Sequence, residues 1–282
     1  MKMKTAFKSN IMKSQVIEQY DKILKSSSLA YEELYINTSY GSTFIIASGK
    51  IDSPPLILLH GAGMNSAMWL GDIGEYSKNY RVYAIDIPGD PGKSDERQFS
   101  LKSSAYADWL YEVLNSLSIS TTNIIGISLG AWLSVKFSIS YPSRVDKLIL
   151  ISPSGIGPQK TSFIFKALIH SLQGERGMEK LYTKVNGNKP VPPTMLQYQK
   201  VIRKSFNFRY ETIPVFSDEE LRKLKMPITL FVGDEDIMLH SIKTADRLRT
   251  LIPSANINIL KDTGHAIISI KSDIIKFLSF NH

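Results

Sequence analysis

The feature that most restricts how this chain can fold is a repeated alternation of short apolar runs with amphipathic helical patterns. Helical spacing of apolar residues is clear in YADWLYEVLNSL and SIKTADRLRTLI, two of the segments that separate the runs. Short apolar runs of this kind fit strands that are buried on both faces. The alternation predicts an α/β fold, with a mostly parallel twisted sheet and helices on both faces. The runs are residues 56–59, 82–85, 123–127, 147–151, 228–232 and 257–260.

The N-terminal part of the chain precedes this alternation and has a different pattern. Between residues 11 and 26, apolar side chains recur at helical spacing, which predicts an amphipathic helix that packs on the outside as an arm. The stretches YEELYINTSY and STFIIASG follow, on either side of Gly41. They predict two antiparallel strands that form a hairpin.

The alternation is interrupted once, between Ile151 and Ile228, where about 75 residues contain no comparable strand. FIFKALIHSL is the clearest helix of this stretch, and GNKPVPPT is a proline-rich break within it. Ligands of such sheets bind at the carboxyl ends of the strands, so an insertion after a strand end is expected to form a lid. We therefore predict an α/β core from residues 1–154 and 217–282, with a helical lid at 155–216 after the sixth strand.

Composition excludes several classes of protein. Of the 282 residues, 43% are hydrophobic and 21% are charged, and no apolar run approaches the ~18 residues that a membrane span needs. The basic start MKMKTAFKSNIMKSQ lacks the apolar centre of a signal peptide, so we expect a cytoplasmic protein. The absence of cysteine excludes disulfides, thiolate catalysis and sulfur-ligated metals.

The net charge of +8 is concentrated in one part of the chain. Residues 159–225 contain 13 lysines and arginines against 6 aspartates and glutamates, which accounts for +7 of the total. Lys200, Arg203, Lys204 and Arg209 form the densest cluster, which could attract an acidic substrate, a membrane surface or nucleic acid. The sequence contains no recognisable nucleic-acid-binding module, so we expect no nucleic-acid partner, and a solvated helix face is the simpler interpretation.

The pentad GISLG at Gly126–Gly130 joins a predicted strand to a predicted helix. In a strand-to-helix elbow of the GxSxG type, the serine lies in a strained turn and its neighbours must be small. The turn exposes the hydroxyl of Ser128 and directs the amide of Leu129 and the helix N-terminus at a bound group. Such a pentad also arises by chance, so the flanking strand and helix patterns carry the hypothesis that Ser128 is a nucleophile.

A second backbone donor is expected after the strand LILLHGAG. The turn at His60 and Gly61 would let the amide of Ala62 point inward beside that of Leu129, and together the two amides would bind an oxyanion. The alternative is that Gly61 and Gly63 only permit a tight loop. We interpret His60 as a structural residue that is hydrogen-bonded beside this loop.

A serine nucleophile needs an imidazole to accept its proton and a carboxylate to orient that imidazole. Of the five histidines, His265 is the best candidate, because it follows a strand and a short loop, INILKDTG. Asp236 is the preferred acid, three residues beyond Gly233 at the end of ITLFVG, with Asp234 or Glu235 as the alternative. The other position for an acid, SPSGIGP, contains no carboxylate.

These motifs occur in the order that α/β-hydrolases show, Ser, Asp, His. Over nearly its whole length the chain resembles that family, and more closely the bacterial carboxylesterases of the naproxen-esterase kind. The resemblance implies hydrolysis of carboxylic esters without a metal or organic cofactor. It also implies Ser128 as nucleophile, Asp236 as acid, His265 as base, and the Ala62 and Leu129 amides as oxyanion donors. The motifs that carry it are YGSTFIIASG, LILLHGAGMNSAMW, YRVYAIDIPGDPGKS, IIGISLGAW, LILISPS, FSDEELRKLKMPITLFVGDED and KDTGH.

The chain departs from the family pattern in two places. The usual DxxGxGxS turn reads DIPGDPGKS at residues 86–94, and the segment after His265 lacks the acidic-proline pair often found there. The predicted lid matches least well, so the substrate stays open. A thioesterase, lactonase, perhydrolase, carbon–carbon bond hydrolase or ligand-binding receptor would share the same residues. Aromatic and aliphatic lid residues could favour a hydrophobic ester or pack on the core: Phe163, Phe165, Leu168, Leu172, Tyr198, Phe206 and Phe208.

Overall fold

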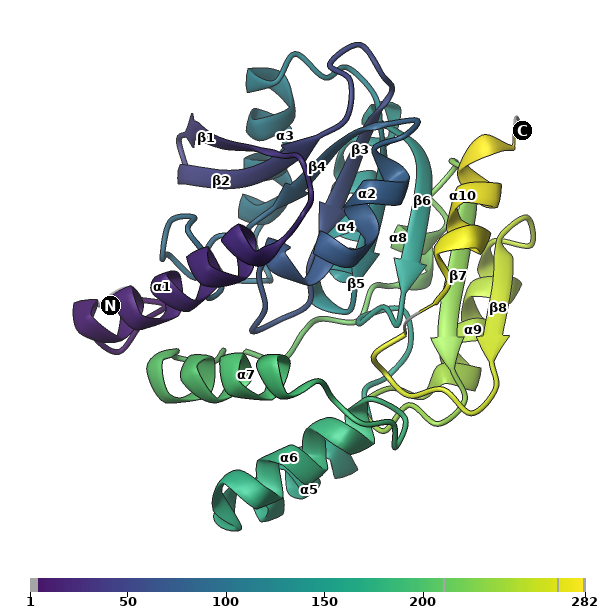
Figure 1. Cartoon of the computed structure of the whole chain (residues 1–282). Coiled ribbons are helices and arrows are strands. Elements are labelled where there is room, and N and C mark those ends of the chain that lie inside the picture. The colour runs from purple at the N-terminus through teal and green to yellow at the C-terminus, as the bar shows by residue number, and fades with distance from the viewer. Residues whose placement is uncertain (1–4, 210, 268, 281–282) are drawn as a thin grey trace.

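A computed structural model of the chain describes residues 5–209, 211–267 and 269–280. The first four residues of the basic N-terminal stretch and His282 therefore lie outside the described part. Figure 1 shows one central twisted sheet with helices around it. Its eight strands lie in the order β1-β2-β4-β3-β5-β6-β7-β8. The strands are β1 (Glu32–Thr38), β2 (Gly41–Ser48), β3 (Pro55–Leu59), β4 (Arg81–Ile85), β5 (Thr122–Ile127), β6 (Val145–Ile151), β7 (Ile228–Gly233) and β8 (Asn256–Leu260).

The pairing of the strands confirms the predicted fold class. Strands β3 to β8 pair in parallel with their neighbours, whereas β1 pairs antiparallel with β2, and β2 with β4. Every parallel strand therefore ends at the same edge of the sheet, the lower edge in Figure 1. Side chains that follow β5, β7 and β8 meet at this edge.

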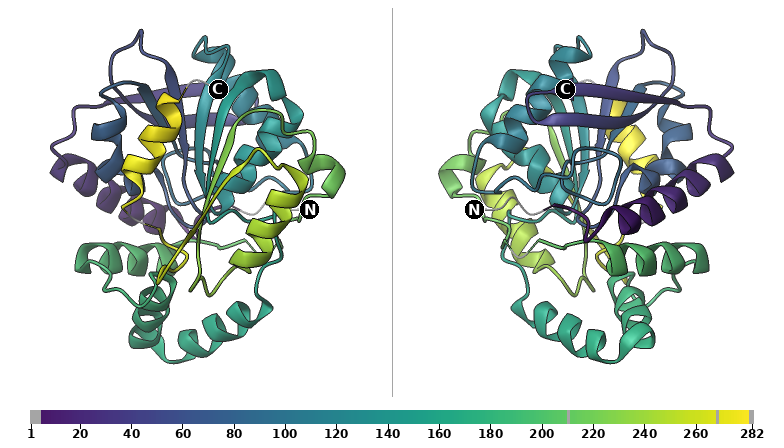
Figure 2. Two further views of the ribbon diagram at one scale, coloured as in Figure 1. Left: turned by 90° about the vertical axis from the view of Figure 1, so that its right-hand side faces the viewer. Right: turned by 90° about the vertical axis from the view of Figure 1, so that its left-hand side faces the viewer.

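Helices cover both faces of the sheet, as the two side views in Figure 2 show. One core packs α3, α4 and α9 on the sheet, and the other packs α1, α2, α7 and α10 on the opposite face. The helices are α1 (Asn10–Ser26), α2 (Leu70–Tyr76), α3 (Ala105–Ser116), α4 (Leu129–Ser140), α5 (Thr161–Leu172), α6 (Gly174–Val185), α7 (Pro193–Ser205), α8 (Asp218–Leu221), α9 (Ser241–Leu251) and α10 (Lys271–Ser279).

Strand residues alternate between the two cores, as the two-residue period of a strand requires. In β3, Ile57 and Leu59 lie in the core beneath α3 and α4, while Leu56 and Leu58 lie in the core beneath α1 and α2. All four side chains are fully buried. Burial on both faces explains why these strands read as continuous apolar runs rather than as an alternating pattern.

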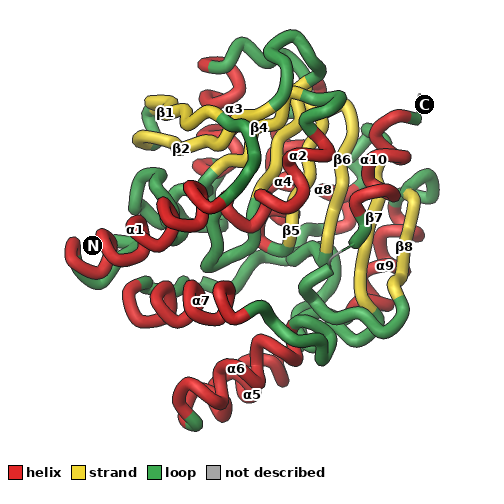
Figure 3. Tube along the Cα trace, in the orientation of Figure 1, coloured by secondary structure: helices red, strands yellow, loops and turns green. Residues whose placement is uncertain are grey.

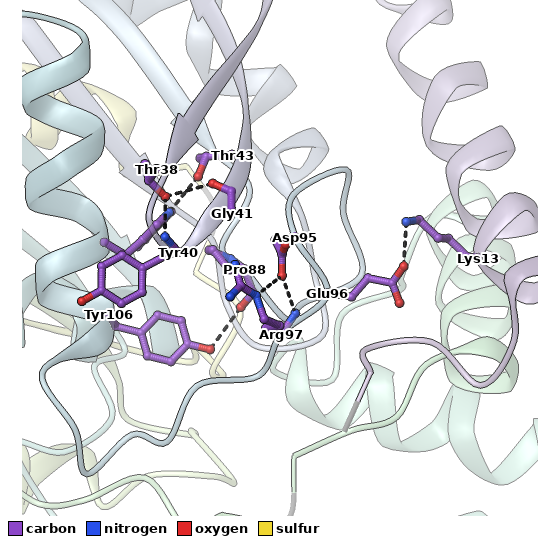
Figure 4. Close-up of polar contacts among 11 residues, drawn as sticks. Lys13, Thr38, Tyr40, Gly41, Thr43, Pro88, Asp95, Glu96, Arg97 and Tyr106 are labelled. Atoms are coloured by element: carbon purple, nitrogen blue, oxygen red, sulfur yellow. Dashed lines mark hydrogen bonds and ion pairs between the residues drawn. The ribbon is translucent and has the colours of Figure 1, made fainter. Parts of the chain in front are cut away.

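A local hydrogen bond closes the β1–β2 turn, and polar contacts tie the loop after β4 to the helices (Figure 4). At the turn, Gly41 has a φ of +104°, and its carbonyl accepts a hydrogen bond of 2.9 Å from the Thr38 hydroxyl. In the loop after β4, Glu96 forms an ion pair of 2.6 Å with Lys13 of α1. The Tyr106 hydroxyl of α3 donates to the carbonyl of Pro88 at 3.1 Å. The loop that follows β4 is thereby fixed against both helical layers.

Helices α5, α6 and α7 occupy most of residues 155–216, which we call the insertion. They lie beyond the carboxyl ends of the strands, and Figures 1 and 3 show α5 and α6 at the end of the molecule farthest from the sheet. The sharp turn between these two helices uses Gly174, whose φ is +66°. α7 packs against α1, so one helix of the insertion is anchored to the N-terminal helix.

Candidate active site

Ser128 lies at a sharp turn between the end of β5 and the start of α4. Its φ of 54° and ψ of −107° place a non-glycine residue in a strained backbone conformation. The Ser128 amide donates to the carbonyl of Ile151 in β6 at 3.0 Å, and its own carbonyl accepts from the Trp132 amide at 3.0 Å. These bonds hold the strained residue between the neighbouring strand and the first turn of the helix.

The two glycines of the pentad are required by the close packing of this turn. A Cβ atom on Gly126 would lie 2.6 Å from the backbone of Ala131. A Cβ atom on Gly130 would lie 2.2 Å from the carbonyl oxygen of Leu59 in β3. Both distances are far below van der Waals contact with backbone that cannot move aside. Only glycine fits at either position, and this explains the spacing of the motif.

Asp236 and His265 form a buried pair at the same edge of the sheet. Asp236 follows β7 and is fully buried, and its Oδ2 lies 2.7 Å from Nδ1 of His265, which follows β8. The other oxygen, Oδ1, accepts the amides of Met238 at 2.6 Å and Leu239 at 2.9 Å. Burial alone would raise the pKa of Asp236, but the contact with His265 and these two amides hold the pKa below its ordinary value. Asp236 is therefore an anion that accepts the Nδ1–H of the ring.

The end of β6 connects Ser128 to His265. Ile151 accepts the Ser128 amide, and the hydroxyl of the next residue, Ser152, donates to the carbonyl of His265 at 2.8 Å. The serine and the histidine are thus attached to consecutive residues of one strand end. Within the described residues no hydrogen bond joins the Ser128 hydroxyl to the imidazole, and such contacts are often long in enzymes without substrate.

The loop after β3 runs beside Ser128. A Cβ atom on Gly61 would lie 3.7 Å from the Cβ of Ser128, so the backbone of this loop borders the turn at Ser128. In the part of the chain that the structure describes, the amides of Ala62 and Leu129 donate no hydrogen bond to another protein group. Both donors are therefore available to a bound group.

His60 is held by hydrogen bonds on both ring nitrogens. Its Nε2 accepts the amide of Ile87 at 2.9 Å, which fixes the proton on Nδ1, and Nδ1 lies 2.9 Å from the carbonyl of Gly61. The ring is fully buried. His60 supports the loop and has no nitrogen left for proton transfer.

Sequence reasoning did not identify Asp90 as a residue of this region. Its Oδ1 accepts the amide of Gly63 at 2.9 Å, so the carboxylate holds the residue that directly follows Ala62. Burial raises the pKa of Asp90, although the charge of Arg209 opposes this change. The available signal was the unusual turn DIPGDPGKS, in which Asp90 and Pro91 stand where the common pattern has a single residue between its two glycines.

The remaining candidates are spread around the site. Asp234 and Glu235 are exposed, and Asp234 accepts the amide of Thr263 at 3.3 Å. Two of the insertion's aromatic residues, Tyr198 and Phe206, are buried in the core beside α1. Phe163 is half-buried, Phe208 is 44% exposed, and Phe165, Leu168 and Leu172 are more than half exposed. Among the residues described, no group of three or more metal-binding side chains comes together.

Comparisons with known proteins agree with this geometry. The α/β hydrolase fold family matches residues 54–175. The carboxylesterase YbfK of Bacillus subtilis is 32% identical over 258 residues, which cover 89% of this chain and 87% of the relative. The uncharacterized carboxylesterase nap of the same organism is also 32% identical, over 89% of this chain and 86% of its own length.

Solved structures show the same likeness. The crystal structure of the carboxylesterase CesB (YbfK) from Bacillus subtilis has a TM-score of 0.84 at 30% identity and covers 95% of this chain and 99% of its own. That of naproxen esterase (carboxylesterase NP), also from Bacillus subtilis, has a TM-score of 0.82 at 29% identity, with 94% and 98% covered. The chain therefore belongs to the α/β-hydrolase family, alongside these Bacillus subtilis carboxylesterases.

Proposed function

We propose that this protein is a serine carboxylesterase that cleaves esters with a hydrophobic acyl or alcohol group through an acyl-serine intermediate. The observation that carries the proposal is the buried Asp236–His265 pair, which one strand end connects to the strained turn of Ser128. Two relatives of similar length are named as carboxylesterases, which supports the same reaction class.

In the first half of the reaction, Asp236 keeps the His265 proton on Nδ1, so that Nε2 is free to accept the Ser128 proton. The Ser128 oxygen attacks the ester carbonyl, and the carbonyl oxygen becomes negative. The amides of Ala62 and Leu129 stabilise this oxyanion, and the N-terminus of α4 adds a favourable dipole. His265 then gives its proton to the leaving alcohol, and the acyl group stays on Ser128.

In the second half, water takes the place of the alcohol. His265 removes a proton from this water, the resulting hydroxide attacks the acyl carbonyl, and the same two amides bind the second oxyanion. Collapse of this intermediate returns the proton to Ser128 and releases the carboxylic acid. Each proton that His265 accepts is passed on, so the enzyme ends the cycle unchanged.

Two observations support a hydrophobic substrate. Phe208 of the insertion, which is 44% exposed, lies close to the loop that contains Ala62, because a Cβ atom on Gly63 would be 2.8 Å from its ring. A structural neighbour is named naproxen esterase. From these two observations we infer that the ester substrate has a hydrophobic acyl or alcohol group.

A substrate panel tests the proposal. Hydrolysis of p-nitrophenyl esters of increasing acyl length, acyl-thioesters and lactones is compared for the wild type and for Ser128→Ala. We expect the carboxylic esters to be the best substrates and the variant to lose at least about 10³-fold in kcat. The control is Ser138→Ala, a buried serine of α4 that bonds to the helix backbone at 2.8 Å, and it should keep full activity. Faster turnover of thioesters or lactones, or an active Ser128→Ala, would contradict the proposal.

A further inference from the structure

Helix α5 carries a stripe of large apolar side chains that the structure leaves uncovered. Phe165, Leu168, Ile169 and Leu172 are 67%, 58%, 56% and 80% exposed. Their spacing of three, one and three residues places all four on one side of the helix. Soluble proteins rarely expose such a contiguous apolar patch unless it binds something. We call these four residues the α5 stripe.

The α5 stripe faces away from α6. α6 approaches α5 at His170, because a side chain on Gly177 of α6 would overlap the His170 carbonyl. His170 is buried, and at 3.6 residues per turn it lies on the side of α5 opposite the stripe. Figures 1 and 2 place α5 and α6 at the outermost end of the molecule. The stripe therefore lies on the side of α5 that faces away from α6, at the same end of the molecule as the carboxyl ends of the strands.

The charges around the α5 stripe are almost all positive. The sequence has no acidic residue between Asp146 and Glu175, a stretch that includes all of α5. On α6, three exposed cations follow one another at four-residue spacing and form a row next to the side that meets α5: Arg176, Lys180 and Lys184. The whole insertion carries 10 lysines and arginines against 3 glutamates, a net charge of +7. The rest of the chain has 24 lysines and arginines against 23 aspartates and glutamates.

We propose that the α5 stripe and the basic row of α6 dock this protein on an anionic lipid surface. An amphipathic helix binds such a surface by placing its apolar side at the boundary of the acyl chains while nearby cations approach the anionic headgroups. A second copy of this chain fits less well, since two insertions of +7 would repel each other. Nucleic acid would satisfy the cations and leave the apolar stripe in water.

Docking in this orientation has a consequence for the substrate. The strand ends that carry Ser128 and His265 are on the same side of the sheet as the insertion, so the site would face the lipid. Hydrophobic esters partition into lipid, and a docked enzyme would meet them at high local concentration. The docking itself does not require the proposed esterase activity and is tested separately from it.

Co-sedimentation with lipid vesicles tests the proposal. Ser128→Ala, as well as the wild type, should bind vesicles that contain phosphatidylglycerol at least about tenfold more strongly than pure phosphatidylcholine vesicles, with the difference lost at about 0.5 M salt. Phe165→Ser with Leu172→Ser should weaken this binding at least about tenfold. Lys180→Glu with Lys184→Glu provides a second, independent variant with the same expected direction. Ile51→Ser is the matched control, because Ile51 is 76% exposed far from α5.

Several results would overturn the docking proposal. One is equal binding to neutral and anionic vesicles, and another is full binding by both double variants. A dimer of the wild type in sedimentation velocity that Leu172→Ser dissociates would instead assign the stripe to a second copy. A raised KM of the Phe165→Ser, Leu172→Ser variant for a short water-soluble ester, without vesicles, would assign the stripe to the substrate site.

Discussion

Replacing Asp236 by Asn tests how the buried pair controls the imidazole. The substitution preserves size, and the remaining carbonyl oxygen can still accept the Met238 and Leu239 amides that now bond to Oδ1. The new amide group would face Nδ1 of His265, at the position where Oδ2 now lies 2.7 Å away. Because an amide NH₂ donates, the ring would have to accept at Nδ1 and carry its proton on Nε2. A protonated Nε2 cannot take the proton of Ser128.

The size of the expected loss in kcat follows from the loss of the His265 tautomer that carries its proton on Nδ1. We expect kcat to fall about 10⁴-fold, which corresponds to a barrier raised by about 5 kcal/mol, while KM changes only a few-fold. Steady-state hydrolysis of a p-nitrophenyl ester measures both constants, and the melting temperature shows that the variant is folded. Asp234→Asn, an exposed residue of the same loop, is the matched control and should retain full activity. A loss of less than about tenfold in kcat for Asp236→Asn would refute the assigned role.

Further predictions concern the turn, the loop after β4 and the N-terminal helix. Gly130→Ala should destabilise the fold by more than about 3 kcal/mol, because its Cβ would lie 2.2 Å from a backbone oxygen, whereas Gly71→Ala, with nothing within 4 Å, should be neutral or stabilising in urea unfolding. Equal stability of the two variants would contradict the packing argument. Burial raises the pKa of Asp90, so the folded state keeps a proton that the unfolded state loses above about pH 4. The wild type should therefore lose stability relative to Asp90→Asn as the pH rises from about 4, and melting temperatures that run in parallel across pH would count against this. Tyr20→Phe removes a hydroxyl that lies 3.0 Å from Asp86 and should cost about 1–3 kcal/mol of unfolding free energy, a value that a calorimetric scan can check.

The sheet could be predicted from sequence because its signals are local. The apolar run at residues 228–232 corresponds to β7 (Ile228–Gly233), and the run at 257–260 to β8 (Asn256–Leu260). β7 is buried on both faces, as its apolar run predicts, whereas β8 lies at the edge of the sheet and none of its residues is buried, so for β8 that expectation was wrong. The antiparallel hairpin was also predictable, because Gly41 separates two β-rich stretches and supplies the positive φ of the turn.

The hydrogen bonds that support the candidate site could not be predicted from the sequence. The bond between Ser152 and His265 joins residues 113 positions apart, and the bond between Asp90 and Gly63 joins residues 27 positions apart. No periodic pattern in the sequence predicts such contacts, because they depend on how strands and loops pack in the folded chain. The glycines around Ser128 could be predicted from the motif. Nearby backbone leaves no room for a side chain at either position.

Helix α5 shows a further limit of sequence patterns. Its apolar spacing predicts a helix with one apolar side, and that side would ordinarily be assigned to a core. In the structure, Phe165 and Leu172 of this side are exposed. Periodicity indicates that a helix has an apolar side, but only tertiary structure shows whether the protein itself covers it.

The most direct test of the esterase proposal is to trap the acyl group on the enzyme. A p-nitrophenyl ester is mixed with the wild type and quenched with acid during the first turnover, and the digested protein is analysed by mass spectrometry. We predict that the peptide containing Ser128 gains the mass of the acyl group, and that Ser128→Ala gains none. Product formation without any acylated peptide, or acylation of a different residue, would contradict the assignment of Ser128 as the nucleophile.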